Sequence, residues 1–300
     1  MNLSEFAASD SPPLQLPALA ADKDLARDLQ DRLHVIGLLD PPADGKFGPV
    51  TRWALSEFCK AAEIKFEEAL SRPIARALLA PSAESLFPLK PGTDLAGKIV
   101  AAMLRRRHWV ARHPACVNIV YIEGMNDDGT PNDNKPNHFN DQRTLIRVSP
   151  AGVPKIIKQW DATTEPGKFW TMNPMVPEGA ARIAFDQYKS WAVGKHHPGK
   201  RGEHEALVQV EDITVFRDLN KDFKRDGDRQ FTGVFFVNQH WGYDLPKTDI
   251  GKAGAGCLVG RTRDGHREFM KLLKADPRFV ANNAYRFMTT VMPSSALAQT

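Results

Sequence analysis

The stretch from Asn238 to Arg261, NQHWGYDLPKTDIGKAGAGCLVGR, holds the residue types best suited to covalent chemistry. It contains His240, then a run of small residues, then Cys257. A cysteine is a nucleophile as its thiolate, and a nearby imidazole can take the thiol proton. Glycine lets the backbone approach a substrate closely, so the N–H groups around Gly256 could stabilise an oxyanion. The pattern therefore indicates a Cys257–His240 site for nucleophilic catalysis.

This stretch resembles the catalytic signature of the L,D-transpeptidase family. In that signature a histidine and a glycine precede a serine or threonine, any residue, a glycine and a cysteine. His240 and Gly242 match the first part, and Gly256 and Cys257 match the second. The resemblance implies acyl transfer on peptidoglycan stem peptides through a Cys257 thioester, which an amine or water then resolves. It implies His240 as the proton donor to the leaving D-alanine, and no cofactor.

The chain departs from this signature around Cys257. The expected serine or threonine is Gly254, and the histidine often found next is Ala255. The usual arginine after the cysteine is Val259, and Arg261 follows two positions later. His204 precedes a predicted strand and is a candidate for the same cleft. The expected substrate-binding residues of this region are Gly242, Ala255, Arg261 and His204.

A metal site is an alternative use of the histidines. Those that could gather in space are His196, His197, His204 and His240. The chain lacks the H-x-H pair of zinc wall endopeptidases and has no C-x-x-C pair, so we predict no metal.

Acidic residues suggest two weaker alternatives. The stretch 218–228 resembles a calcium loop but lacks the glycine and the glutamate of an EF-hand, which favours an acidic hairpin turn. Glu123, Asp161 and Glu165 could serve glycosidase chemistry, but nothing in the sequence marks a pair of them. Cys257 itself could be a buried small hydrophobe, as free cysteines often are.

A second motif lies near the N-terminus, where two apolar helices are predicted on either side of the turn DGKFG. This pattern resembles the three-helix peptidoglycan-binding domain. The matching residues are Leu29, Gln30, Leu33, Gly37, Leu38, Asp44, Gly45, Phe47, Gly48, Thr51, Ala54 and Phe58. That family holds the peptide stem in the groove beside the turn. The resemblance therefore implies Asp44 and Phe47 as substrate-binding residues and peptidoglycan as the partner.

The C-terminal part has short runs of β-branched and aromatic residues, which are typical of strands. Predicted strands are Val117–Ile122, Thr144–Val148, Lys155–Trp160, Ala206–Val210, Ile213–Arg217 and Gly233–Gln239. Predicted helices are Asp94–Ala111, Gly179–Trp191 and Asp264–Ala275. We expect an α+β chain with a small N-terminal three-helix module and a mostly-β L,D-transpeptidase-like domain. The expected boundaries are a flexible leader over 1–21, the helical module over 22–80, a linker and helix over 81–114, and the cysteine domain over 115–300.

Composition limits the remaining function classes. The chain has 300 residues, 42% of them hydrophobic and 25% charged, which is typical of a globular protein with room for about two domains. No apolar run is long enough to span a membrane, and a net charge of +4 is too small to indicate nucleic-acid binding. The N-terminus has no basic and apolar signal segment, so we expect action in the periplasm or cell wall after lysis or specialised export. A wall-degrading lysin or effector, and a non-catalytic binder on the same scaffold, remain open alternatives.

Overall fold

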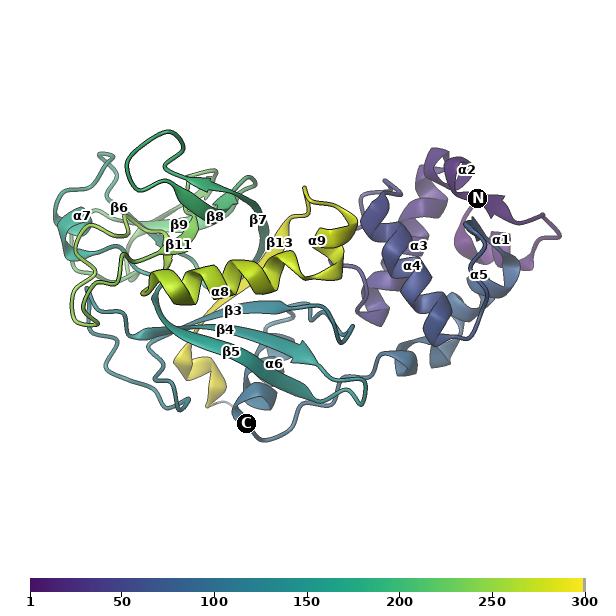
Figure 1. Cartoon of the computed structure of the whole chain (residues 1–300), viewed down its shortest axis with the longest axis horizontal. Coiled ribbons are helices and arrows are strands. Elements are labelled where there is room, and N and C mark those ends of the chain that lie inside the picture. Colours follow the sequence, from purple (N-terminus) through teal and green to yellow (C-terminus); the bar gives the residue numbers. More distant parts are fainter. Residues whose placement is uncertain (299–300) are drawn as a thin grey trace.

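The computed structural model describes residues 1–298 and consists of a helical part and a β-barrel part (Figure 1). The helical module comprises residues 3–87. Its elements are α1 (Leu3–Ala8), β1 (Leu14–Gln15), α2 (Leu16–Ala21), α3 (Lys23–Ile36), α4 (Pro49–Ala61), β2 (Ala69–Leu70), α5 (Arg72–Leu79) and the 3-10 helix η1 (Pro81–Leu86). The rest of the chain forms the barrel domain. This combination of helices and a large sheet confirms the predicted α+β class.

The turn between α3 and α4 is built around Gln30, which is almost fully buried. Its side-chain oxygen accepts hydrogen bonds from the backbone N–H groups of Asp44 (3.1 Å) and Gly45 (2.7 Å). Its amide nitrogen donates to Asp44 Oδ1 (2.9 Å) and to the carbonyl of Lys46 (3.1 Å). A buried amide must have its donors and acceptors satisfied, so the Asp-Gly turn and this glutamine require each other.

The predicted flexible leader over residues 1–21 is wrong. These residues form α1, β1 and α2, and Asn2 caps α1 by accepting a hydrogen bond from the N–H of Glu5 (2.8 Å). Leu3, Phe6 and Leu19 are buried in the same core as α3, α4 and α5. Pro12 and Pro13 lie between α1 and β1, whereas Pro17 lies in the first turn of α2, and the buried apolar residues of both helices complete the core.

Eight strands of the barrel domain close into a barrel in the order β11-β12-β5-β4-β3-β13-β7-β8. Their bounds are β3 (Asn118–Glu123), β4 (Asp141–Val148), β5 (Pro154–Thr163), β7 (Gln187–His196), β8 (His204–Gln209), β11 (Gln239–Trp241), β12 (Leu258–Gly260) and β13 (Phe287–Pro293). A separate three-stranded sheet contains β6 (Ala180–Ile183), β9 (Ile213–Asp218) and β10 (Arg229–Gly233). The helices are α6 (Leu95–Arg105), α7 (Lys168–Met172), α8 (Arg263–Lys274), α9 (Pro277–Ala281) and the 3-10 helix η2 (Ser294–Leu297).

Strand β3 is buried on both faces, which explains the run of four large apolar or aromatic residues, Ile119–Ile122, between its polar ends. Ile119 and Tyr121 belong to the core cluster that includes Phe269 of α8. Val120 and Ile122 alternate with them and pack with residues of α6. The two helices therefore cover opposite faces of this part of the sheet, as Figure 1 also shows.

The predicted helix Gly179–Trp191 is wrong, because this segment contains β6 and the first half of β7. Its alanines favour a helix locally, but β6 pairs with β9 and β7 pairs with both β8 and β13. Pairing on both sides of a strand overrides weak local propensity. The predicted strand Gly233–Gln239 is also wrong over 234–238, which connect β10 to β11 without regular structure.

A buried carboxylate joins the helical module to the barrel domain. Asp40 follows α3, and its carboxylate accepts a hydrogen bond from the hydroxyl of Tyr285 (2.8 Å). It also pairs with Lys189 (2.6 Å) and Arg278 (3.4 Å). Burial favours the protonated acid, but Lys189 and Arg278 hold the pKa of Asp40 below its ordinary value. Arg278 also pairs with Asp276 of the barrel domain (2.7 Å), so its bond to Asp40 extends a buried ionic network from the barrel into the module.

A fragment of residues 1–90 is expected to fold on its own, whereas a fragment of residues 22–80 is expected to be several kcal/mol less stable. The shorter fragment lacks Leu3, Phe6 and Leu19, and each buried apolar side chain contributes about 1.5–3 kcal/mol. Thermal unfolding followed by circular dichroism compares the two. Equal melting temperatures would mean that residues 1–21 add nothing to the core.

Candidate functional site

The pairing of two short strands brings His240 and Cys257 to one edge of the barrel. β11 and β12 are parallel neighbours, with Gln239 opposite Leu258. Leu258 belongs to the barrel core, and Gln239 donates a hydrogen bond to the hydroxyl of Thr289 on β13 (2.8 Å). Side chains alternate along a strand, so His240 and Cys257, each one residue away from this pair, face the other side.

Cys257 and His240 line the same cavity, which has a volume of about 610 Å³. Ala255 from the glycine-rich loop lines it as well. Aromatic side chains contribute much of the remaining wall, and these are Trp170, Phe235 and Phe236. The cavity is large enough for several residues of a peptide, and the thiol and the imidazole both border it.

His240 is held as a neutral base. Its Nδ1 donates a hydrogen bond to the backbone carbonyl of Trp241 (2.8 Å), which leaves Nε2 without a proton. Burial, together with neighbouring His196, lowers the pKa of His240 well below its ordinary value. His196 stacks on His240 with ring centroids 3.9 Å apart and an interplanar angle of 12°. The stacked ring and the carbonyl together fix the orientation of the imidazole.

The Cys257 thiol is also neutral at rest. Its Sγ accepts a hydrogen bond from the backbone N–H of Asn238 (3.4 Å) and lies 3.7 Å from the carbonyl oxygen of Phe236. Burial raises the pKa of Cys257 to about 11, although the Asn238 N–H acts in the opposite direction. Cys257 and His240 line the same cavity, but within residues 1–298 the thiol forms no hydrogen bond with the imidazole. For a neutral thiol to act as the nucleophile, its proton has to move to a base as the sulfur attacks, which is general-base catalysis.

The backbone before Cys257 adopts a conformation that only glycine takes readily. Gly256 has φ +118°, and a Cβ there would lie 2.5 Å from the carbonyl oxygen of Ala181. Within residues 1–298, the backbone N–H groups of Gly256 and Cys257 donate no hydrogen bond. Two neighbouring N–H groups without partners beside a nucleophile are suited to holding an oxyanion.

The position of the expected serine or threonine is closed by packing. A Cβ on Gly254 would lie 3.0 Å from Val259 Cγ2, and the Gly254 carbonyl accepts a hydrogen bond from the N–H of Gly167 (2.9 Å). A hydroxyl-bearing residue here would force its neighbours to shift. The departure from the signature at Gly254 therefore follows from how this loop packs.

Three residues predicted to bind substrate do not line the cavity. Gly242 is buried, and a Cβ there would lie 2.8 Å from the ring of Phe139 and 2.9 Å from the carbonyl of Arg261. The Arg261 side chain pairs with Asp161 (3.1 Å). His204 stacks on the ring of Trp241 (3.8 Å between centroids). Gly242, Arg261 and His204 lie outside the cavity lining, whereas Ala255 borders the cavity. The substrate-binding roles of all four residues stay predictions.

Asp44 and Phe47 lie in the helical module and do not border the cavity with Cys257. The Asp44 carboxylate accepts hydrogen bonds from Gln30 and from the N–H of Lys46 (both 2.9 Å), so it organises its own turn. Phe47 lines a separate groove of about 640 Å³ that also contacts Pro277 and Val280 of the barrel domain. Their substrate-binding roles stay predictions.

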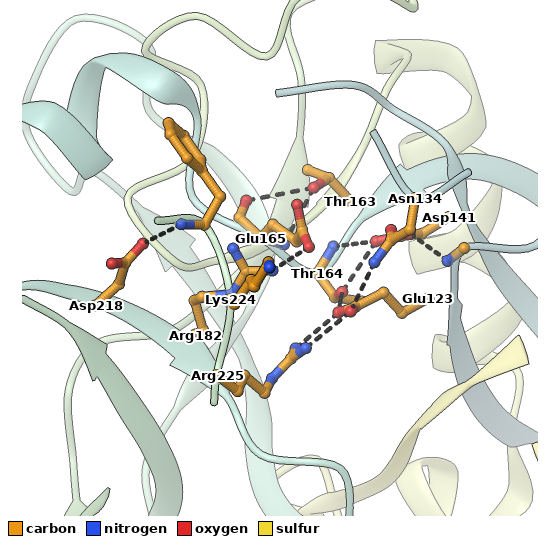
Figure 2. A network of polar contacts seen from close by, with 12 residues as sticks. Glu123, Asn134, Asp141, Thr163, Thr164, Glu165, Arg182, Asp218, Lys224 and Arg225 are labelled. Carbon is orange, nitrogen blue, oxygen red and sulfur yellow. Dashed lines mark hydrogen bonds and ion pairs between the residues drawn. The ribbon is translucent and has the colours of Figure 1, made fainter. Parts of the chain in front are cut away.

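Buried acids and arginines form a polar network in the barrel domain (Figure 2). Arg225 donates two hydrogen bonds to Glu123 (2.8 and 2.6 Å). Although burial favours the protonated acid, Arg225 lowers the pKa of Glu123 to about 2. The Thr164 hydroxyl contacts both Glu123 (2.7 Å) and Asp141 (2.9 Å). It has one proton for these two acids, so one of them must be the donor in the second hydrogen bond.

Asp141 is the acid that carries the proton. Burial and the nearby charges of Glu123 and Glu165 raise the pKa of Asp141 well above its ordinary value. Glu165 forms a buried ion pair with Arg182, which is adjacent in sequence to the Ala181 carbonyl that contacts the Cys257 loop. Burial and the nearby charge of Glu123 raise the pKa of Glu165 to about 7, although Arg182 acts in the opposite direction. Glu123 and Glu165 are both buried and paired with arginines, and their use as a glycosidase pair stays a hypothesis.

The structure also shows how the residues of the two alternative cation sites, the histidines and the acidic stretch 218–228, are arranged. His196 and His204 pair across the hairpin of β7 and β8, and both lie within 6 Å of His240 between ring centroids. Nevertheless, no group of three or more His, Cys, Asp or Glu residues within 1–298 is arranged to hold a metal ion. The acidic stretch 218–228 is the loop of the β9–β10 hairpin, where Asp218 accepts hydrogen bonds from the backbone of Asp222 and Phe223 (both 3.1 Å).

The sequence analysis named His196 only as a possible metal ligand and Arg217 only as the end of a predicted strand. His196 is the last residue of β7, whose first half was predicted as part of a helix. Arg217 lies in β9, which belongs to the separate three-stranded sheet. Both line the cavity. A histidine or an arginine near a strand end is common, so only the folded arrangement reveals these two.

Comparisons with known proteins give little further information. No protein-family model matches the chain, and no curated protein matches it. Among solved structures, the chain is similar to a fused Zn-dependent amidase/peptidase/peptidoglycan-binding domain-containing protein from Clostridium acetobutylicum, with 15% identity and a TM-score of 0.27. The match covers 93% of this chain and 99% of that one. A TM-score this low does not establish a common fold. Within residues 1–298, no helix is long and apolar enough to cross a membrane.

Iodoacetamide is expected to label Cys257 before Cys59 and Cys116, because Cys257 borders the cavity while the other two are fully buried. With a thiol pKa of about 11, the rate at Cys257 should rise about tenfold per pH unit between about pH 7 and 9.5. Timed quenching and peptide mass mapping measure all three rates. A plateau near about pH 8.5, where an unperturbed thiol titrates, would contradict the buried-thiol assignment.

Proposed function

We propose that this protein is a cell-wall enzyme that transfers acyl groups of peptidoglycan stem peptides through a thioester on Cys257. The observation that carries the proposal is the shared cavity. Cys257 and His240 both line it, and the free Nε2 of a neutral His240 is available as the base. The nucleophile, the base and the group that orients the base are the three parts required for covalent catalysis.

In the first step, Cys257 Sγ attacks the amide carbonyl after the third residue of the stem peptide while His240 Nε2 takes the thiol proton. The C–S bond forms, and the carbonyl oxygen becomes an oxyanion beside the N–H groups of Gly256 and Cys257. The C–N bond then breaks, and His240 gives its proton to the amine of the leaving D-alanine. Atoms and charges balance without any oxidant or cofactor.

In the second step, an acceptor attacks the thioester and regenerates the thiol. An amine acceptor produces a cross-link, and water produces a shortened stem peptide. A lysin or secreted effector that hydrolyses the same bonds would use the same intermediate. The proposal therefore includes both outcomes, and it places the protein's action in the periplasm or cell wall after lysis or specialised export.

The helical module is proposed to hold the enzyme on peptidoglycan. The support is the turn built by Gln30 and Asp44, which corresponds to the motif of the three-helix wall-binding domains. The buried contacts of Asp40 with Lys189 and Arg278 would then fix the catalytic cavity relative to the bound wall.

A non-catalytic wall-binding protein is the second candidate. The raised pKa of Cys257 favours it, because a thiol with a pKa of about 11 has very little thiolate at neutral pH. Under that alternative the cavity binds stem peptides without cleaving them.

The test is mass spectrometry of digested sacculi and of a purified tetrapeptide stem after incubation with the full chain. The wild type is expected to release the fourth residue or to form cross-links. C257A should abolish both reactions, and H240A should reduce the rate by a factor of about 10²–10⁴, which is typical of a lost general base. C59A is the matched control, since it removes a thiol from the helical module and leaves the cavity intact.

Unchanged activity in C257A would exclude the thioester mechanism. The non-catalytic alternative would be favoured if the wild-type protein sediments with sacculi but leaves the wall peptides intact.

A further inference from the structure

The cavity with Cys257 has an asymmetric charge. Its charged side chains, apart from histidines, are Lys200, Arg217 and Lys252, and no aspartate or glutamate lines it. These cations come from three separate segments, namely the β7–β8 loop, β9 and the loop before β12. Because low-dielectric walls strengthen such a field, the cavity favours a ligand with negative charge.

Arg217 differs from the two lysines in being half-buried and oriented. Its guanidinium lies 5.0 Å from the centre of the Phe235 ring, and Phe235 lines the same cavity. One of its nitrogens donates to the carbonyl of Gly179 (3.3 Å). Burial lowers the pKa of Arg217, the nearby charge of Glu178 acts in the opposite direction, and no acid within residues 1–298 approaches Arg217 closely enough to form a salt bridge. An arginine fixed on an aromatic ring, with donors to spare, is suited to a bidentate bond with a carboxylate.

The wall of the cavity also contains exposed apolar side chains. Met175 and Phe236 both line it and are 74% and 76% exposed. Large apolar side chains that remain this exposed beside a nucleophile are suited to the aliphatic part of a ligand. The ligand that matches the cavity therefore combines an apolar chain with an anionic group.

We propose that Arg217 is a specificity-determining residue that selects acyl donors with a free carboxylate near the scissile amide over the same donors with that carboxylate amidated. The inference rests on the proposed function, because it names a preference among stem peptides at the same site. Arg217 holds the carboxylate and takes no part in breaking the bond. Lys200 and Lys252 add attraction over a longer range, which salt screens.

The first test needs no peptide substrate. Iodoacetate and iodoacetamide have nearly the same size, and only iodoacetate is an anion. The rate with iodoacetate is divided by the rate with iodoacetamide, first for Cys257 and then for free 2-mercaptoethanol. The first ratio divided by the second measures the anion preference of the cavity. We expect a normalised ratio of about 10 at low salt, falling towards 1 in R217Q, since one charge-assisted hydrogen bond corresponds to about tenfold in affinity.

The matched control is Arg229→Gln. Arg229 lies directly opposite Arg217 in the β9–β10 pair and also stacks on an aromatic ring, that of Phe231 (5.2 Å). It does not line the cavity. R229Q removes the same charge from the same hairpin and should leave the ratio unchanged within about twofold, because Arg229 is exposed to solvent and its charge is screened. A normalised ratio near 1 in the wild type, or equal losses in R217Q and R229Q, would overturn the role of Arg217.

The second test uses two tetrapeptide stems that differ only in a free or amidated carboxylate. The wild type should process the free acid with a kcat/KM about tenfold higher, and R217Q should process both equally, mainly through a change in KM. Equal processing by the wild type would overturn this inference and leave the proposed function standing. Processing of neither peptide, together with an anion-selective thiol, would overturn the proposed function instead.

Discussion

The parallel pairing of β11 with β12 is the constraint on which the whole site depends. Gln239 lies opposite Leu258. Cys257 comes just before Leu258 and His240 just after Gln239, so both side chains lie on the face away from the barrel core. A shift of one strand by one residue relative to the other would place Cys257 and His240 on opposite faces. The register is fixed from inside the barrel, because Leu258 fills the core and Gln239 bonds to Thr289 of β13.

Burial shifts the protonation of several groups around the site. The histidines stack on one another as neutral rings, and burial lowers the pKa of His196 to about 3. In the network of acids and arginines, burial and the neighbouring acids raise the pKa of Asp141 well above its ordinary value. The cavity itself is lined by cations and by no aspartate or glutamate, so a substrate would supply the opposite charge.

The sequence predicted those parts of the structure that depend on local signals. The helices around the DGKFG turn, the strands with β-branched runs and the joint cavity of Cys257 and His240 follow from spacing and from motifs. The helix predicted over Gly179–Trp191 failed because strand pairing with distant segments outweighs an alanine-rich local sequence. The ordered N-terminus and the cavity positions of His196 and Arg217 depend on contacts between residues far apart in the chain, which no single sequence window contains.

Intact-mass spectrometry during turnover tests the central claim most directly. The full chain is mixed with a tetrapeptide stem, quenched in acid at short times, and the adduct is located by peptide mapping. The account predicts a tripeptidyl adduct on Cys257 that accumulates and then disappears, and that C257A never shows. Release of the fourth residue without any adduct on the wild-type enzyme, or with equal speed in C257A, would contradict it.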